Sequence, residues 1–78
     1  MGKKNETYTQ CALARKSTVE VSWIPTKFAN KGKYVKFKQG DGSWEDGWLV
    51  QETYTVQDAK YLIAHGQDYK NTRKASDI

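Results

Sequence analysis

The stretch that decides the fold reads GKYVKFKQGDGSWEDGWLV and spans residues 32–50. Residues 33–39 and 48–52 suit extended strands, because apolar and polar side chains alternate along them. Val35 and Phe37 share one face of the first strand. The opposite face of that strand holds Tyr34, Lys36 and Lys38. On the second strand, Trp48 and Val50 share one face and Leu49 and Gln51 the other. The stretch therefore predicts a β-hairpin.

Two Asp-Gly pairs lie between these strands, Asp41-Gly42 and Asp46-Gly47. Glycine tolerates positive φ, and an aspartate side chain can accept a hydrogen bond from the backbone of a turn. Either pair is suited to the tight turn of the hairpin, and the other pair to a β-bulge.

Two further strands are expected before the hairpin. Residues 7–14 form a weak strand pattern with Cys11 and Leu13 on one face. Residues 18–24 alternate clearly, which predicts that Val19, Val21 and Trp23 point inward. Pro25 ends this strand because it has no amide donor. In the connection that follows, Phe28 and Ala29 are expected to fold back against the core.

A short helix is expected after the hairpin, over residues 55–65. Thr55 and Asp58 have the spacing of a capping box, and Gly66 suits the position just after a helix. The apolar residues at helical spacing are Val56, Ala59, Leu62 and Ile63. Residues 67–78 carry few apolar anchors, and they are expected to form a tail or docking arm, either free or draped over the domain.

These elements predict a single small, mainly β domain over residues 7–66, after a flexible N-terminus at 1–6. An SH3-like barrel of about four to five antiparallel strands, with the helix at 55–65, is the expected architecture, because closure hides both edges of a short sheet. An OB-like barrel and a compact α+β sheet are the alternatives. In the barrel, Val21, Phe37 and Val50 should meet in one interior.

Composition and charge indicate where the protein is located and what kind of partner it suits. The 78 residues contain one cysteine, so the fold must rest on packing without an internal disulfide. Neither a signal peptide nor a membrane-length apolar run is visible, which predicts a soluble, intracellular protein. Residues 1–40 hold nine Lys and Arg against two Glu, whereas residues 41–78 hold four against seven acidic residues. A basic first half suits a polyanion or an acidic protein surface, although the two halves could also cancel within one domain.

From Trp23 onward the chain resembles small, mostly uncharacterised proteins of tailed bacteriophages. The resemblance rests on Trp23-Ile24-Pro25, on the pattern from Trp44 to Val50 (WEDGWxV), and on the final Ala75-Ser76-Asp77-Ile78. It covers about two thirds of the chain and carries no catalytic signature. It implies a phage protein acting in the host bacterial cytoplasm, and it assigns no site.

The sequence offers few residues that are suited to catalysis. His65 is the only histidine and falls at the predicted helix end, and Cys11 suits a small buried apolar group. One Cys and one His fall short of the four ligands of a zinc site. Asp41, Glu45 and Asp46 are explained by turn formation, because their spacing matches no EF-hand loop. We expect no catalytic residues, no metal and no cofactor, and therefore no enzyme activity.

The strongest indication of function is a set of basic residues interleaved with an aromatic residue. This pattern is typical of nucleic-acid binding, because cations neutralise phosphates and rings stack on bases. The predicted nucleic-acid-binding residues are Arg15, Lys16, Lys31, Lys33, Tyr34, Lys36 and Lys38. The alternative is a protein-interaction module, acting as a host-factor inhibitor, an adaptor or a virion component. Its predicted partner-binding residues are Trp44, Tyr69, Arg73 and Lys74. The simplest alternative is that these lysines form a solvent-exposed surface that binds no ligand.

Overall fold

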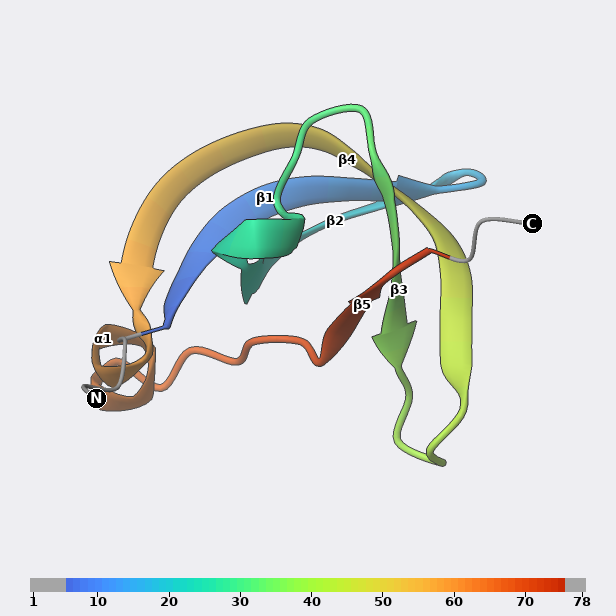
Figure 1. Ribbon diagram of the computed structural model, residues 1–78. Helices are drawn as coiled ribbons and strands as arrows, with labels where there is room; N and C mark the ends of the chain where they lie inside the picture. The colour runs from blue at the N-terminus through green and yellow to red at the C-terminus, as the bar shows by residue number, and fades with distance from the viewer. Residues whose placement is uncertain (1–5, 76–78) are drawn as a thin grey trace, which may run out of the picture.

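The computed structural model describes residues 6–75, in which five strands form one antiparallel sheet in the order β2-β1-β4-β3-β5 (Figure 1). The strands are β1 (Thr7–Arg15), β2 (Thr18–Pro25), β3 (Tyr34–Lys38), β4 (Trp44–Asp58) and β5 (Thr72–Lys74). A 3-10 turn, η1 (Thr26–Phe28), follows β2, and the short helix α1 (Ala59–Ala64) follows β4. The predicted mainly β, small barrel-like class is confirmed. Residues 1–5 and 76–78, which include most of the predicted flexible N-terminus and the end of the predicted tail, lie outside the described residues.

Strand β4 organises the sheet because it pairs with β1 along most of its length and with β3 at its start. Its register with β1 shifts twice and its register with β3 shifts once. Each shift places extra residues on one strand, and such bulges bend a strand and increase its twist. β4 accordingly follows a wide arc over the core (Figure 1). The bend that the sequence predicts after Val50 is present, and the strand continues to Asp58.

The two Asp-Gly pairs have different positions in the β3–β4 hairpin, one in the turn and one in the bulge. Gly42 has φ +92° and donates its N–H to the Gln39 carbonyl at 3.0 Å, so Asp41-Gly42 lies in the tight turn. Gly47 has φ +89°, and the register shift between β3 and β4 falls at Asp46-Gly47. One of the two arrangements left open by the sequence is thereby selected.

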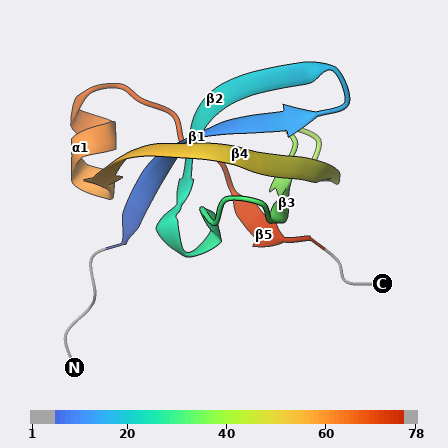
Figure 2. The same ribbon diagram turned by 90° about the horizontal axis from the view of Figure 1, so that it is seen from above.

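The segment after α1 runs from one side of the curved sheet to the other and joins β2 to β3 (Figures 1 and 2). Tyr69 forms a parallel bridge with Trp23 of β2, and the Lys70 N–H donates to the Trp23 carbonyl at 3.0 Å. Three residues later, β5 pairs with β3. Tyr69 and Thr72–Lys74 therefore pair with the sheet. The part of the predicted tail that the structure describes is thus draped over the domain rather than free.

The core gathers residues from four strands: Cys11, Leu13, Ile24, Val35, Phe37, Trp48 and Val50. Phe28 and Ala29 pack against it from the connection after β2, as expected. The Trp48 indole N–H donates to the Glu45 carboxylate at 3.0 Å, which satisfies the one polar atom that this ring carries into the interior.

The expectation that Val19 and Val21 point inward is wrong. Val21 pairs with Ala12, and the next residues along, Ser22 and Cys11, pair with each other. Because directly opposed residues share a face, and Cys11 faces the core, Val21 lies on the outer face, where it is 56% exposed. Ile24 lies on the opposite face of β2 from Val21, and its side chain is part of the core. Trp23 is buried, but outside the main core cluster.

The helix is shorter than predicted, because residues 55–58 still belong to β4. Asp58 is the N-cap, and its side chain accepts a hydrogen bond from the Tyr61 N–H at 2.8 Å. Gly66, with φ +66°, lies just after the helix as expected. Leu62 is the only buried residue of α1, whereas Ile63 is exposed. Within residues 6–75, no helix combines the length and the apolar composition needed to cross a membrane.

Candidate nucleic-acid interface

The alternation of β3 sorts its residues as the sequence predicts. Val35 and Phe37 are buried, each with 2% of its surface exposed. Tyr34 and Lys38 are exposed, and Lys36 is half-buried. Tyr34, Lys36 and Lys38 therefore lie on the outer face of the sheet, with the core directly behind the strand.

The register of β3 with its two neighbours adds an aromatic ring and a further cation to this face. Lys38 is directly opposite Trp44 of β4, and Lys36 is directly opposite Arg73 of β5. Opposed residues share a face, so all four side chains lie on the same outer surface. We call the surface formed by Tyr34, Lys36, Lys38, Trp44 and Arg73 the basic face.

Arg73 and Trp44 are in contact within the basic face. The guanidinium carbon lies 4.5 Å from the centroid of the Trp44 ring, which is cation–π geometry. Since β3 lies between β4 and β5, the Arg73 side chain spans the middle strand to reach the ring. The contact orders both groups on the surface, where one Trp face is covered by a cation and the residue is only half-buried.

Two of the predicted residues, Arg15 and Lys16, lie at the end of the first hairpin. The Arg15 Nε donates to the Asp46 carbonyl at 2.7 Å, and its Nη1 lies 3.5 Å from the Glu45 carboxylate. Arg15 thus fastens the end of β1 to the bulge of β4. Lys16 has φ +56° in the turn between β1 and β2, and it is exposed. Neither residue belongs to the basic face.

The remaining predicted nucleic-acid residues lie near the start of β3. Lys31 pairs with Glu52 across 3.2 Å, and both side chains are largely exposed, so the pair contributes little stability. Lys33 donates no hydrogen bond to a side chain within the described residues; its backbone carbonyl accepts from the Val50 N–H at 3.0 Å. Its side chain lines a cleft beside β3.

Tyr69, predicted to bind a partner, is bridged to Trp23 of β2 and packs against another tyrosine. Its ring lies 4.5 Å from the Tyr8 ring, centroid to centroid. Burial and the nearby Glu6 carboxylate raise the pKa of Tyr8. The adjacent Lys70 pairs with Glu20 at 3.6 Å and lies 5.4 Å from the centroid of the Phe37 ring.

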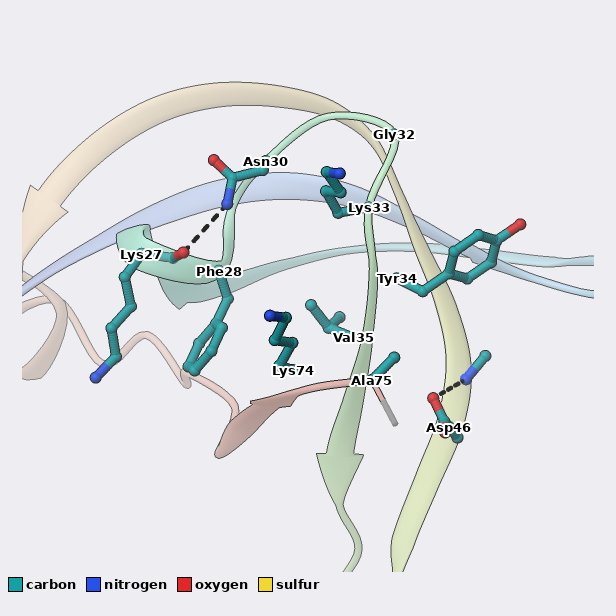
Figure 3. Close-up of a pocket in the computed structure, with 11 residues that line it drawn as sticks. Lys27, Phe28, Asn30, Gly32, Lys33, Tyr34, Val35, Asp46, Lys74 and Ala75 are labelled. Atoms are coloured by element: carbon teal, nitrogen blue, oxygen red, sulfur yellow. Dashed lines mark hydrogen bonds between the residues drawn. The ribbon is translucent and has the colours of Figure 1, made fainter. Parts of the chain in front are cut away.

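The cleft beside β3 has a volume of about 1020 Å³. It is lined by residues of η1, the following connection, the start of β3, the β4 bulge and β5 (Figure 3). Lys74, predicted as partner-binding, lines it together with Lys33 and Tyr34. Lys27 and Phe28 also line it, and they were not among the predicted site residues. A basic residue next to an aromatic residue just after Pro25 was the signal that could have singled them out.

The acidic residues of the hairpin are used locally. The Asp41 carboxylate accepts from the Ser43 N–H at 2.9 Å and from its hydroxyl at 2.6 Å, and these bonds lower the pKa of Asp41. The Asp46 carboxylate accepts from the Gly47 N–H at 2.7 Å. Among residues 6–75, no three carboxylate, histidine or cysteine side chains gather in a way that could hold a metal ion.

Cys11 and His65 are likewise engaged in the fold. The Cys11 thiol is fully buried and 3.5 Å from the Thr9 carbonyl, and burial raises its pKa to about 11. A thiol in this state is a poor nucleophile at neutral pH. The His65 ring packs on the Tyr61 ring, with centroids 4.2 Å apart.

Comparison of the chain with protein-family models, with curated proteins and with solved structures gives no match to any of them.

Proposed function

We propose that this protein is a non-enzymatic module that binds single-stranded nucleic acid through the basic face. The observation that carries the proposal is the register of β3: it sets Lys36 opposite Arg73 and Lys38 opposite Trp44, on the face that also holds Tyr34. Three cations and two exposed or half-exposed rings thereby lie on one face of the sheet.

The chemistry of a single strand fits these groups. Its phosphates are neutralised by Lys and Arg, and its unpaired bases stack on aromatic rings, which contribute about 1–3 kcal/mol per base. Each base has a π-face, so this mode of binding tolerates many sequences. Three of the five residues of the basic face are cations, so phosphate contacts should supply most of the affinity.

A matched pair of single variants tests the proposal. Lys38→Glu reverses a charge on the basic face, and Lys60→Glu reverses one on α1, where Lys60 is also exposed to solvent. Both variants change the net charge by the same amount. We expect Lys38→Glu to weaken binding to an oligonucleotide by about tenfold or more, and Lys60→Glu to have little effect. Equal losses for the two variants would mean that net charge alone drives the association.

The protein-interaction alternative predicts a different result in one experiment. Tagged protein is captured from bacterial lysate with and without added nuclease. Under our proposal the captured material is released by nuclease. A protein partner that survives nuclease, and is lost on Trp44→Ala, would support the interaction module instead.

The resemblance to small proteins of tailed phages supplies the proposed setting, which is the cytoplasm of a bacterial host. In that setting the abundant single-stranded ligands are RNA and the intermediates of DNA replication, and a soluble module with a basic face would meet both. Immunodetection in purified virions and in infected-cell extract separates this setting from a virion component.

A further inference from the structure

The cleft beside β3 carries a second inference, which rests on the proposed function. Its volume of about 1020 Å³ lies at the upper end of what small-ligand sites occupy, about 300–1000 Å³. The cleft is lined by η1, β3 and β5, and η1 and β5 lie against each other. Tyr34 belongs both to the lining of the cleft and to the basic face, so the two surfaces meet at this residue.

Three lysines from three separate segments line the cleft: Lys27 of η1, Lys33 just before β3, and Lys74 of β5. Among the residues that the structure describes, none of the three has a carboxylate within 4.0 Å. The one acidic residue of the lining, Asp46, uses its carboxylate on the Gly47 N–H. The lining therefore has an excess of positive charge that fits an anionic ligand.

The apolar part of the lining selects among anions. Val35 is a buried part of the lining, and the half-buried Phe28 ring lies on the same side of β3 as Lys74 (Figure 3). Lys27 Nζ lies 5.4 Å from the centroid of that ring, so a cation and an aromatic surface are adjacent. Tyr34 projects to the other side of β3, the side on which β4 lies (Figure 3). A bare phosphate would leave the aromatic and apolar surface unused, whereas a nucleotide offers a phosphate and a flat base together.

We propose that the cleft holds one nucleotide of the bound single strand. Its phosphate lies among Lys27, Lys33 and Lys74, its base packs against Phe28, and Tyr34 separates it from the next nucleotide on the basic face. The cleft thus sets one end of the binding track and fixes where the strand stops.

The test uses the full chain and three probes: thymidine 5′-monophosphate, thymidine and inorganic phosphate. Binding is followed through the backbone amide signals in ¹H–¹⁵N NMR spectra. We expect the monophosphate to shift the amides of residues 27, 28, 33, 74 and 75, and to bind about tenfold more tightly than either fragment. Equal binding of inorganic phosphate and the monophosphate would overturn the nucleotide assignment, as would the absence of shifts in the cleft.

Two variants separate this inference from the function on which it rests. The double variant Lys27→Gln/Lys74→Gln removes two cations of the cleft and leaves the basic face intact. We expect it to lose monophosphate binding about tenfold, while an oligonucleotide still shifts the amides of residues 36, 38 and 73. Lys38→Glu should do the reverse. If the monophosphate binds equally well to the double variant, the cleft is not its site, whatever the basic face does.

An acidic peptide is the competing ligand class, and the same spectra decide it. A short peptide of aspartate and phenylalanine offers carboxylates and a ring at similar spacing. We expect weaker shifts than those caused by the monophosphate. Tighter binding of the peptide at the same amides would contradict the nucleotide assignment.

Discussion

The guanidinium carbon of Arg73 lies 4.5 Å from the centroid of the Trp44 ring. Arg73 belongs to β5 and Trp44 to β4, and β3 lies between these strands, so one cation–π contact links the two strands that flank the lysines of β3. The guanidinium contributes a positive charge to the basic face and a planar surface to the ring, and a lysine would keep only the charge.

This relationship predicts different behaviour for two substitutions of Arg73. Arg73→Lys keeps the charge, so the salt dependence of oligonucleotide binding should stay unchanged while the affinity falls modestly. Arg73→Ala removes one cation and should reduce the magnitude of the slope of log K against log salt by about 0.7. Fluorescence anisotropy across a salt series measures both. Identical slopes for the parent and Arg73→Ala would show that Arg73 does not contact phosphate.

The bulge at Gly47 predicts a stability difference between two glycines. Gly47 has φ +89°, and a Cβ there would lie 3.7 Å from Arg15 Nε, so the strain comes from the backbone rather than from crowding. Gly47→Ala should lower the free energy of unfolding by about 1–2 kcal/mol. Gly40→Ala is the control, because Gly40 has no positive φ and open space around its Cα. Urea denaturation compares the two. Equal stability would mean that the bulge does not require glycine.

The register of β1 with β2 predicts that two valines differ in importance. Val21 is 56% exposed, whereas Val50 is fully buried in the core. Val21→Thr should change the free energy of unfolding by less than about 0.5 kcal/mol. Val50→Thr places a hydroxyl in the interior and should cost about 2 kcal/mol. Urea denaturation of both variants measures the difference, and a large cost at Val21 would contradict the register.

The buried thiol predicts a specific pH dependence of stability. Burial raises the pKa of Cys11 to about 11, whereas in the unfolded chain the thiol ionises near its ordinary value of 9.0. Above that value the unfolded state holds fewer protons than the folded state, so stability falls as the pH rises from about 9 to about 11. Cys11→Ala should lose less stability over this range. Urea midpoints of both proteins at several pH values test this, and the other titrating groups, Tyr8 included, are common to both. Parallel curves would contradict a buried neutral thiol.

The hairpin of residues 32–50 could be predicted from the sequence because its signals agree. Val35 and Phe37 alternate with Tyr34 and lysines, and only one alternation buries the apolar residues. The two Asp-Gly pairs indicated one turn and one bulge, but not which was which. That choice depends on the pairing of Phe37 with Glu45 and of Val35 with Trp48, which is a property of the two strands together.

Three features could not be predicted, each because it depends on a distant partner. Val21 carries the alternation of a buried position, yet its face is set by the pairing with Ala12. The start of α1 is delayed because residues 55–58 complete a strand against β1. Strand β5 has no apolar residue, and it exists only through its pairing with β3.

Dependence on residues that are distant in the sequence also explains which parts of the candidate site could be predicted. The basic alternation of β3 could be seen from local sequence. The meeting of Arg73 with Trp44 could not, since it joins residues from β4 and β5 through their registers with β3. The cleft could not be predicted either, because Lys27 and Lys74 lie far apart in the sequence and are brought together only by the fold.

The most direct measurement of the central claim is a salt titration of oligonucleotide binding by the parent and by the double variant Lys36→Glu/Lys38→Glu. Fluorescence anisotropy of a labelled single strand of about 12 nucleotides is followed, with circular dichroism as the control for folding. With three phosphates neutralised by Lys36, Lys38 and Arg73, the parent should show a slope of about −2 in log K against log salt. The double variant should remain folded and lose most of its affinity. A folded double variant that binds the strand as the parent does would contradict the account.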